Sequence, residues 1–131
     1  MSKKKKALIT GISGQDGAYL ARLLIKKGYN VIGGIRCDTR LKPWRLEELG
    51  VHNKVKLIPF ELLDEKKINQ VIKKEKFNEI YNLAAQSFVD KSFLNPVYTN
   101  NVNALGVMRI LESIRNFSKN NVDGKNFSDF L

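Results

Sequence analysis

Thr10-Gly11-Ile12-Ser13-Gly14-Gln15-Asp16-Gly17 is the stretch of this chain that decides the fold. A short apolar run, Ala7-Leu8-Ile9, precedes it and an apolar pattern at helical spacing follows it, so the sequence predicts a strand, a tight glycine turn and a helix N-terminus. The glycine spacing is typical of a phosphate-binding turn. One glycine lets the chain reverse, the next lets the backbone approach a diphosphate, and the third lets helix and strand pack closely.

The elements after the turn complete a βαβ unit. An apolar stripe predicts a helix over about 17–27, which Gly28 ends, and 31–35 is predicted to be a second strand. Three spaced glycines also occur in ordinary strand-to-helix turns. The strands and helix around them favour a dinucleotide site, in which the free N–H groups of the first helical turn and the helix dipole face the anion.

The residues after the second strand decide which dinucleotide fits. An acidic side chain there accepts a hydrogen bond from a ribose 2′-hydroxyl, whereas an arginine pairs with a 2′-phosphate. The candidates are Arg36, Asp38 and Arg40. Arg36 lies nearest to the strand end, which favours NADP over NAD. The alternative that Arg36 is only a solvated loop charge stays open.

Further strands and helices are expected downstream. We predict a short helix over 43–49, a third strand over 54–60, a helix with Asp64 as its N-cap, a fourth strand over 79–84, and a long helix from Pro96 onward that ends at about Arg115. Trp44 is interpreted as a packing residue. Phe117 shows no firm periodicity, so 116–131 is interpreted as a polar, poorly ordered tail and 1–115 as the folded domain.

Composition excludes several classes of protein. The chain has 131 residues, 43% of them hydrophobic, which suits one domain, and no apolar run approaches the roughly 20 residues that a membrane span needs. The lone cysteine, Cys37, cannot form an internal disulfide, so a cytoplasmic location is the default. His52 is the only histidine and has no second ligand at a suitable spacing, so no metal site is expected.

The formal net charge of +10 raises the question of nucleic-acid binding. Many of the lysines fall in an N-terminal tail and on one predicted helix, where they can line a solvated face. No aromatic residues interleave with a basic patch, so we expect no nucleic-acid partner. A basic balance also suits anionic small ligands.

Several segments match the pattern of one family. They are Ala7 to Ala21, in which Gln15-Asp16-Gly17 follows the second glycine, then Asn82-Leu83-Ala84-Ala85-Gln86-Ser87, Ser92-Phe93, Asn95-Pro96-Val97-Tyr98-Thr99 and Leu111-Glu112-Ser113-Ile114-Arg115. On these segments the chain resembles the GDP-mannose 4,6-dehydratase family of the extended short-chain dehydrogenase/reductase superfamily. The resemblance spans residues 7 to about 115.

The resemblance implies roles for individual residues. The diphosphate of NADP would lie against Gly11, Ile12, Ser13, Gly14, Gln15 and Asp16, with Gly17 completing the motif. Arg36 would hold the 2′-phosphate, and Glu61 and Leu62 stand where the family has an Asp-Leu pair at the adenine. The ribose and nicotinamide side would be lined by Leu83, Ala84, Ala85, Gln86 and Ser87, with Tyr98 as a further contact. Phe88 stands where many relatives carry histidine.

The family's complete enzyme is a lyase. Its bound NADP oxidises C4 of the mannose in GDP-mannose, water is lost across C5 and C6, and the hydride returns to C6. This chemistry needs a Ser or Thr, a Glu and a Tyr-x-x-x-Lys pair, in which the lysine lowers the pKa of the tyrosine. Four residues after the four tyrosines stand Leu23, Gly33, Ala85 and Val102. We therefore assign no catalytic residue and expect a truncated, N-terminal cofactor-binding portion that is inactive alone.

The expected architecture is an α/β fold, a partial Rossmann-like doubly wound parallel sheet in the order 3-2-1-4. Ligands would lie at the carboxyl ends of the strands, beside the switch between strands 1 and 4. Two alternatives stay open: a stand-alone NADP-binding or interaction module that pairs its exposed fourth strand with another protein or a second copy, and a related sugar-nucleotide dehydratase or epimerase.

Overall fold

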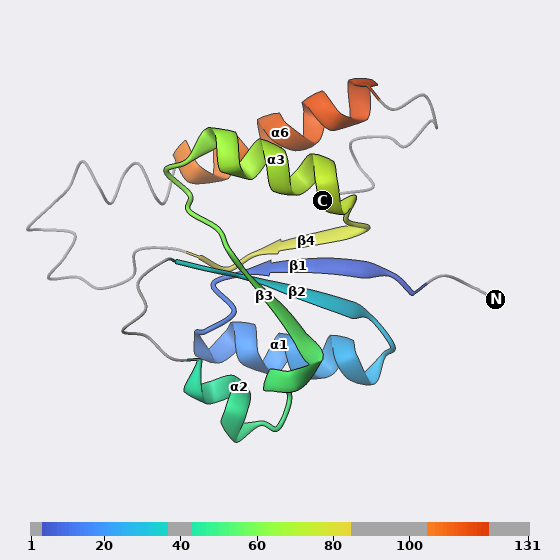
Figure 1. Ribbon diagram of the computed structural model, residues 1–131, viewed down its shortest axis with the longest axis vertical. Coiled ribbons are helices and arrows are strands. Elements are labelled where there is room, and N and C mark those ends of the chain that lie inside the picture. Colours follow the sequence, from blue (N-terminus) through green and yellow to red (C-terminus); the bar gives the residue numbers. More distant parts are fainter. Residues whose placement is uncertain (1–3, 37–42, 85–104, 121–131) are drawn as a thin grey trace, which may run out of the picture.

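A parallel sheet of four strands forms the centre of the computed structural model, which describes residues 4–36, 43–84 and 105–120 (Figure 1). The strand order is β3-β2-β1-β4, which confirms the predicted topology. In the register, Leu8 lies opposite Ile32 on one side and Ile80 on the other. The strands are β1 (Lys6–Thr10), β2 (Asn30–Ile35), β3 (Val55–Pro59) and β4 (Glu79–Asn82).

Helices cover both faces of the sheet. One face is covered by α1 (Gln15–Lys26) and α2 (Trp44–Glu48), and the other by α3 (Glu65–Glu75) and α6 (Gly106–Asn120) (Figure 1). A 3-10 turn, η1 (His52–Lys54), precedes β3. Leu8 packs in the core on the α3 and α6 side, whereas Ala7 and Ile9 pack on the α1 side. Because both faces are covered, the middle of β1, Ala7-Leu8-Ile9, is a continuous apolar run.

Local signals in the sequence set several of the helix ends. Asp64 is the N-cap of α3, and its Oδ1 accepts a hydrogen bond from the Lys67 N–H at 3.0 Å, which confirms the predicted cap. Gly28 and Gly50 follow α1 and α2 with positive φ angles. Among the described residues, no helix is long and apolar enough to cross a membrane.

The last described helix ends later in the chain than the sequence pattern predicts, and the predicted start at Pro96 lies outside the described residues. The expected end at about Arg115 is wrong, because α6 continues to Asn120. Ile110 and Ile114 are buried, and Phe117 packs against the same core, so the apolar face of the helix continues for another turn. The expectation that Phe117 follows no periodic pattern is therefore also wrong, and the helix crosses the proposed boundary at residue 115. Residues 121–131 lie outside the described part of the chain.

Glu75, at the end of α3, joins two lysines from the sheet. Its Oε2 accepts a hydrogen bond from Lys6 Nζ at 3.3 Å, its Oε1 accepts one from Lys56 Nζ at 3.2 Å, and its side chain is 10% exposed. Lys6 Nζ also donates to the Glu75 carbonyl at 3.0 Å. Burial by itself raises the pKa of Glu75, but the hydrogen bonds and positive charges of Lys56 and Lys6 together hold it below its ordinary value.

This lowered pKa makes a pH-dependent prediction. A carboxylate whose pKa is lower in the folded state stabilises the fold above its unfolded-state pKa, and this contribution disappears as the pH falls through the folded-state pKa. We expect Glu75→Gln to lower the free energy of unfolding by about 1 kcal/mol at pH 7, and the difference from the unmodified chain to shrink toward pH 3. Urea unfolding at both pH values measures it, with the exposed Glu47, changed to Gln, as control. An equal loss at both pH values would contradict this account.

Candidate nucleotide-binding site

The glycine turn connects β1 to α1 at the carboxyl end of the sheet. Gly11 has a φ of +70°, and a Cβ added to it would lie 2.8 Å from the backbone nitrogen of Ala84 and 2.9 Å from the carbonyl carbon of Leu83. Only a residue without a side chain therefore lets the end of β4 lie so close to the turn. The Gly14 N–H donates to the Gly11 carbonyl at 3.1 Å and closes the turn.

The other two glycines have different surroundings. A Cβ on Gly17 would lie 2.5 Å from the Gly11 carbonyl oxygen and 2.7 Å from the Ile12 Cα, whereas a Cβ on Gly14 would meet only the Gly11 carbonyl oxygen, at 3.3 Å. The predicted reversal at Gly11 and the close packing at Gly17 are thus confirmed. The approach of a ligand to the open side of Gly14 stays a prediction.

The first turn of α1 has N–H groups without an acceptor inside the helix. Gly14 is the N-cap and supplies no side-chain cap, and the first hydrogen bond along the helix runs from the Ala18 N–H to the Gly14 carbonyl at 3.0 Å. The N–H groups of Gln15, Asp16 and Gly17 therefore precede the hydrogen-bonded part of the helix. Gln15 and Asp16 are also exposed. Such a helix N-terminus attracts an anion through both its N–H groups and its dipole.

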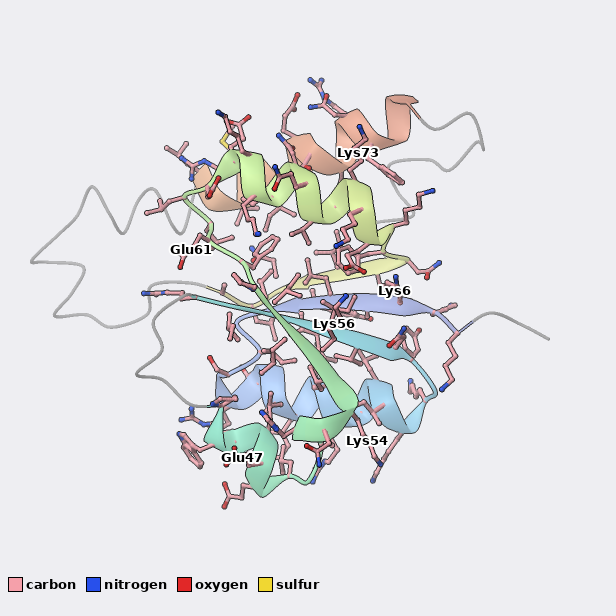
Figure 2. The ribbon with its side chains drawn as sticks, in the orientation of Figure 1. Lys6, Glu47, Lys54, Lys56, Glu61 and Lys73 are labelled. Carbon is pink, nitrogen blue, oxygen red and sulfur yellow. The ribbon has the colours of Figure 1, made fainter. Side chains whose placement is uncertain are left out.

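Other predicted site residues follow the ends of β2 and β3. Arg36 comes directly after β2 and is exposed, while Asp38 and Arg40 lie outside the described residues. Glu61 is partly buried, and Figure 2 shows it at the end of the sheet opposite to Lys6. The structure thus brings Arg36 and Glu61 to the same end of the sheet as the glycine turn.

Two of the predicted residues have side chains in the core. Leu62 is 6% exposed and packs with Ile68, and its carbonyl accepts a hydrogen bond from Arg109 Nη1 at 2.8 Å. Ile12 is buried against Gly33, where its Cδ1 would lie 2.6 Å from an added Cβ. Any contact that Leu62 or Ile12 makes with a ligand must therefore come from the backbone.

The ends of β1 and β4 are tied together by Thr10, to which sequence reasoning assigned no role. Its side chain is 1% exposed, and its Oγ1 donates to Asn82 Oδ1 at 2.5 Å and accepts from the Ala84 N–H at 3.2 Å. The Leu83 N–H donates to the Thr10 carbonyl at 3.2 Å. These bonds fix the point where the strand order reverses, which is where ligands bind in open α/β sheets. The one available signal was a polar residue at the end of an apolar strand.

Thr10 makes a prediction about stability. Replacing it with valine keeps the shape of the side chain but leaves the Ala84 N–H and the Asn82 amide without their partner, so we expect the free energy of unfolding to fall by about 1–3 kcal/mol. Thr10→Ser keeps the hydroxyl and serves as the matched control. Urea unfolding of the two variants measures the difference. Equal stability of the valine and serine variants would contradict the role of the hydroxyl.

Of the remaining predicted site residues, some lie within the described part of the chain and others lie outside it. Leu83 is exposed and Ala84 partly buried, and both continue from β4 alongside Gly11. Ala85, Gln86, Ser87 and Tyr98 lie outside the described residues. Their predicted contacts with the ribose and nicotinamide stay predictions.

Arg45 of α2 also reaches the glycine turn, and sequence reasoning missed it. Its Nη1 donates to the Ser13 carbonyl at 3.2 Å, and its guanidinium lies over the Trp44 ring at 4.4 Å from the centroid. The Trp44 side chain is 53% exposed, so the residue interpreted as a packing residue lies outside the core and packs against the Arg45 guanidinium. The two side chains help to line an open cleft between α1 and α2 with a volume of about 270 Å³.

The sheet order, the two helical layers and the glycine turn define a Rossmann-like α/β fold, and solved structures of epimerases share it. The chain is similar to an epimerase from Methanothermobacter thermautotrophicus, with 28% identity and a TM-score of 0.74 over 88% of this chain and 33% of that one. It is also similar to the UDP-glucose 4-epimerase of Thermus thermophilus, solved in complex with NAD, with 25% identity and a TM-score of 0.73 over 86% and 34% of the two chains.

Sequence comparison identifies the family within this class. The profile of the family described as GDP-mannose 4,6 dehydratase matches residues 8–128, so the chain belongs to the GDP-mannose 4,6-dehydratase family. The GDP-mannose 4,6-dehydratase of Vibrio cholerae is 42% identical over 117 residues, 86% of this chain and 32% of that protein. The GDP-mannose 4,6 dehydratase of Drosophila melanogaster is 45% identical over 120 residues, which are 87% of this chain and 30% of that protein. The chain thus spans about a third of the length of these curated relatives.

Proposed function

We propose that this chain binds a nicotinamide dinucleotide, with NADP preferred over NAD, as the N-terminal cofactor-binding portion of a GDP-mannose 4,6-dehydratase. The observation that carries the proposal is the glycine turn, where Gly11 and Gly17 let β1, α1 and the end of β4 meet closely and the N–H groups of Gln15 and Asp16 precede the hydrogen-bonded part of α1. The NAD complex of the similar Thermus thermophilus epimerase supports a nicotinamide cofactor.

The described residues fit the parts of such a cofactor. The first-turn N–H groups of α1 would hold the diphosphate, and the Arg36 guanidinium would pair with the 2′-phosphate. Glu61 would lie on the adenine side, and Leu83 and Ala84 would border the ribose. The nicotinamide ring of the bound cofactor would accept and return a hydride. In the same proposal, Ala85, Gln86, Ser87 and Tyr98, which lie outside the described residues, would contact the ribose and nicotinamide.

The substrate of the complete enzyme would be GDP-mannose. Because no Tyr-x-x-x-Lys pair exists in the 131 residues, the chain alone has no tyrosine base activated by a lysine in the family's manner. We expect it to be inactive by itself, in the cytoplasm where a lone thiol stays reduced. Dehydration of GDP-mannose by the purified chain without a partner would overturn this expectation.

Cofactor selectivity tests the role of Arg36. Replacing Arg36 with methionine removes a charge-assisted hydrogen bond, which contributes about 1.5–3 kcal/mol, so the affinity for NADPH should fall roughly 10- to 100-fold. The affinity for NADH should change less than about threefold, because NADH lacks the 2′-phosphate. Isothermal titration calorimetry with both cofactors measures the two effects.

The control for this experiment is Lys27→Met. Lys27 is exposed at the C-terminal end of α1, at the other end of the helix from the glycine turn. The substitution therefore removes one positive charge, as Arg36→Met does, but away from the site. We expect both affinities to stay unchanged in this variant. Equal losses of NADPH and NADH affinity in Arg36→Met would contradict the preference for NADP.

A second candidate function rests on β4. Within the described residues, β4 is an edge strand that pairs only with β1, and such an edge favours association with another strand. The chain would then act as an interaction module or a homo-oligomer. Light scattering of the purified chain tests this, and a monodisperse monomer would count against it.

A further inference from the structure

We infer that Arg45 is a positioning residue that holds the Ser13–Gly14 peptide in the orientation required for diphosphate binding. This inference rests on the proposed function, because it concerns the same glycine turn. It adds a residue from a different element, α2, that lies outside the glycine motif and for which spacing along the chain gives no signal.

The Ser13–Gly14 peptide is held at both of its polar ends. Its N–H, which belongs to Gly14, donates to the Gly11 carbonyl at 3.1 Å, and its carbonyl, which belongs to Ser13, accepts from Arg45 Nη1 at 3.2 Å. A peptide unit is planar and rigid, so two bonds at opposite ends fix its rotation. Arg45 thus keeps the Ser13 carbonyl directed toward α2.

Without such a constraint this peptide is able to turn over. Its rotation changes the φ angle of Gly14, and a glycine tolerates almost any φ. A rotated peptide would no longer direct its carbonyl dipole toward α2, and a carbonyl oxygen that faces a phosphate repels it. Because the next N–H groups along the chain, those of Gln15 and Asp16, begin α1, the orientation of this peptide decides the charge pattern presented to the anion.

Arg45 is itself well placed to act as a fixed donor. Its guanidinium lies over the Trp44 ring, which favours one orientation of the cation. The next residue, Leu46, is fully buried and anchors α2 to the core on the α1 side. Trp44 therefore has a role in holding Arg45, which accounts for an indole that is more than half exposed.

Hydrogen exchange in the ligand-free chain tests the positioning directly. In Arg45→Met, the exchange rate of the Gly14 amide, measured by NMR, should rise at least about tenfold, while the amides of Leu8 and Ile9 in β1 keep their rates. Arg45→Lys keeps the charge and one donor, so an intermediate rate is expected. This readout separates local positioning from a general loss of stability, which would accelerate the β1 amides as well.

Cofactor affinity supplies the functional readout. The affinity for NADPH, measured by calorimetry, should fall about tenfold in Arg45→Met, with partial rescue in Arg45→Lys. The matched control is Arg22→Met, since Arg22 also lies over an aromatic ring, that of Tyr19, at 5.2 Å, but on the middle of α1. We expect the control to leave both the Gly14 exchange rate and the affinity unchanged.

The outcomes distinguish this inference from the proposed function. If the unmodified chain takes up no NADPH, the proposed function fails and the role of Arg45 in affinity fails with it, whatever the exchange rates show. If the chain binds NADPH but Arg45→Met leaves the Gly14 exchange rate and the affinity unchanged, only the inference is overturned. If Arg45→Met unfolds, Arg45→Lys decides: unchanged Gly14 exchange and unchanged affinity in that variant would overturn the inference, because lysine lacks the planar guanidinium fork.

Discussion

Gly17→Ala is expected to destabilise the domain by about 2 kcal/mol, because its methyl group meets backbone atoms that cannot rotate away. The added Cβ would lie 2.5 Å from the Gly11 carbonyl oxygen and 2.7 Å from the Ile12 Cα. Overpacking costs about 1–3 kcal/mol, and two backbone contacts at these distances place the cost at the upper end. Alanine regains about 1 kcal/mol of helix propensity, which is too little to offset the clash. Urea unfolding measures the net change.

The control for Gly17→Ala is the same substitution three residues earlier. In Gly14→Ala the methyl group meets only the Gly11 carbonyl oxygen at 3.3 Å, and the φ of −76° and ψ of 171° at Gly14 suit alanine. We expect Gly14→Ala to stay within about 1 kcal/mol of the unmodified chain. A Gly17→Ala variant as stable as Gly14→Ala would show that the helix and the turn do not pack as closely as described.

Gly14→Ala is expected to lower the affinity for the cofactor strongly, although it changes the stability of the fold little. Its methyl group would project over the open side of the turn, where the backbone must approach a diphosphate. Losing one or two charge-assisted hydrogen bonds from the first-turn N–H groups costs about 1.5–3 kcal/mol each, so the affinity for NADPH should fall by roughly 10- to 100-fold or more. Calorimetry with NADPH measures this loss.

Two comparisons make the Gly14 result specific. NADH should lose affinity by a similar factor, because both cofactors carry the same diphosphate, in contrast to the selective loss expected for Arg36→Met. Thermal unfolding without ligand should show that Gly14→Ala is folded. Unchanged NADPH affinity in a folded Gly14→Ala variant would argue against the glycine turn as the diphosphate site.

The backbone of this fold is predictable from the sequence because its signals are local. The apolar run Ala7-Leu8-Ile9, the three spaced glycines, the Asp64 cap and Gly28 after α1 each act within a few residues. They locate β1 and the start of α3 correctly and the start of α1 to within two residues. Strand ends are less certain from sequence. The fourth strand ends at Asn82 rather than at residue 84, and beyond it the Ala84 N–H bonds to the Thr10 side chain rather than to a backbone carbonyl of β1.

The features that the sequence does not reveal are contacts between distant segments. Thr10 and Asn82 meet only because β1 and β4 are neighbours, and Arg45 reaches Ser13 only because α2 lies beside α1. The exposure of Trp44 follows from the same arrangement, since Leu46 takes the buried position in α2. A bulky aromatic residue is usually buried, so no local rule predicts this exception.

The resemblance to a known family predicts the kind of enzyme, which local sequence signals do not. The prediction of the GDP-mannose 4,6-dehydratase family depended on the Gln15-Asp16-Gly17 segment and on the residues after β4, and the match over residues 8–128 confirms it. The preference for NADP rests on Arg36 alone. It therefore depends on the selectivity experiment rather than on the fold.

The central claim is that backbone N–H groups at the start of α1 bind the diphosphate of a nicotinamide dinucleotide. Amide-resolved NMR of the chain during titration with NADPH tests it most directly. We predict saturable shifts of the amide signals that are largest at Gln15 and Asp16 and next largest at Arg36. The amide signals of Gly28 and Lys76, which follow the C-terminal ends of α1 and α3, should not shift. No saturable shift in a folded chain, or shifts that are largest away from the glycine turn, would contradict the account.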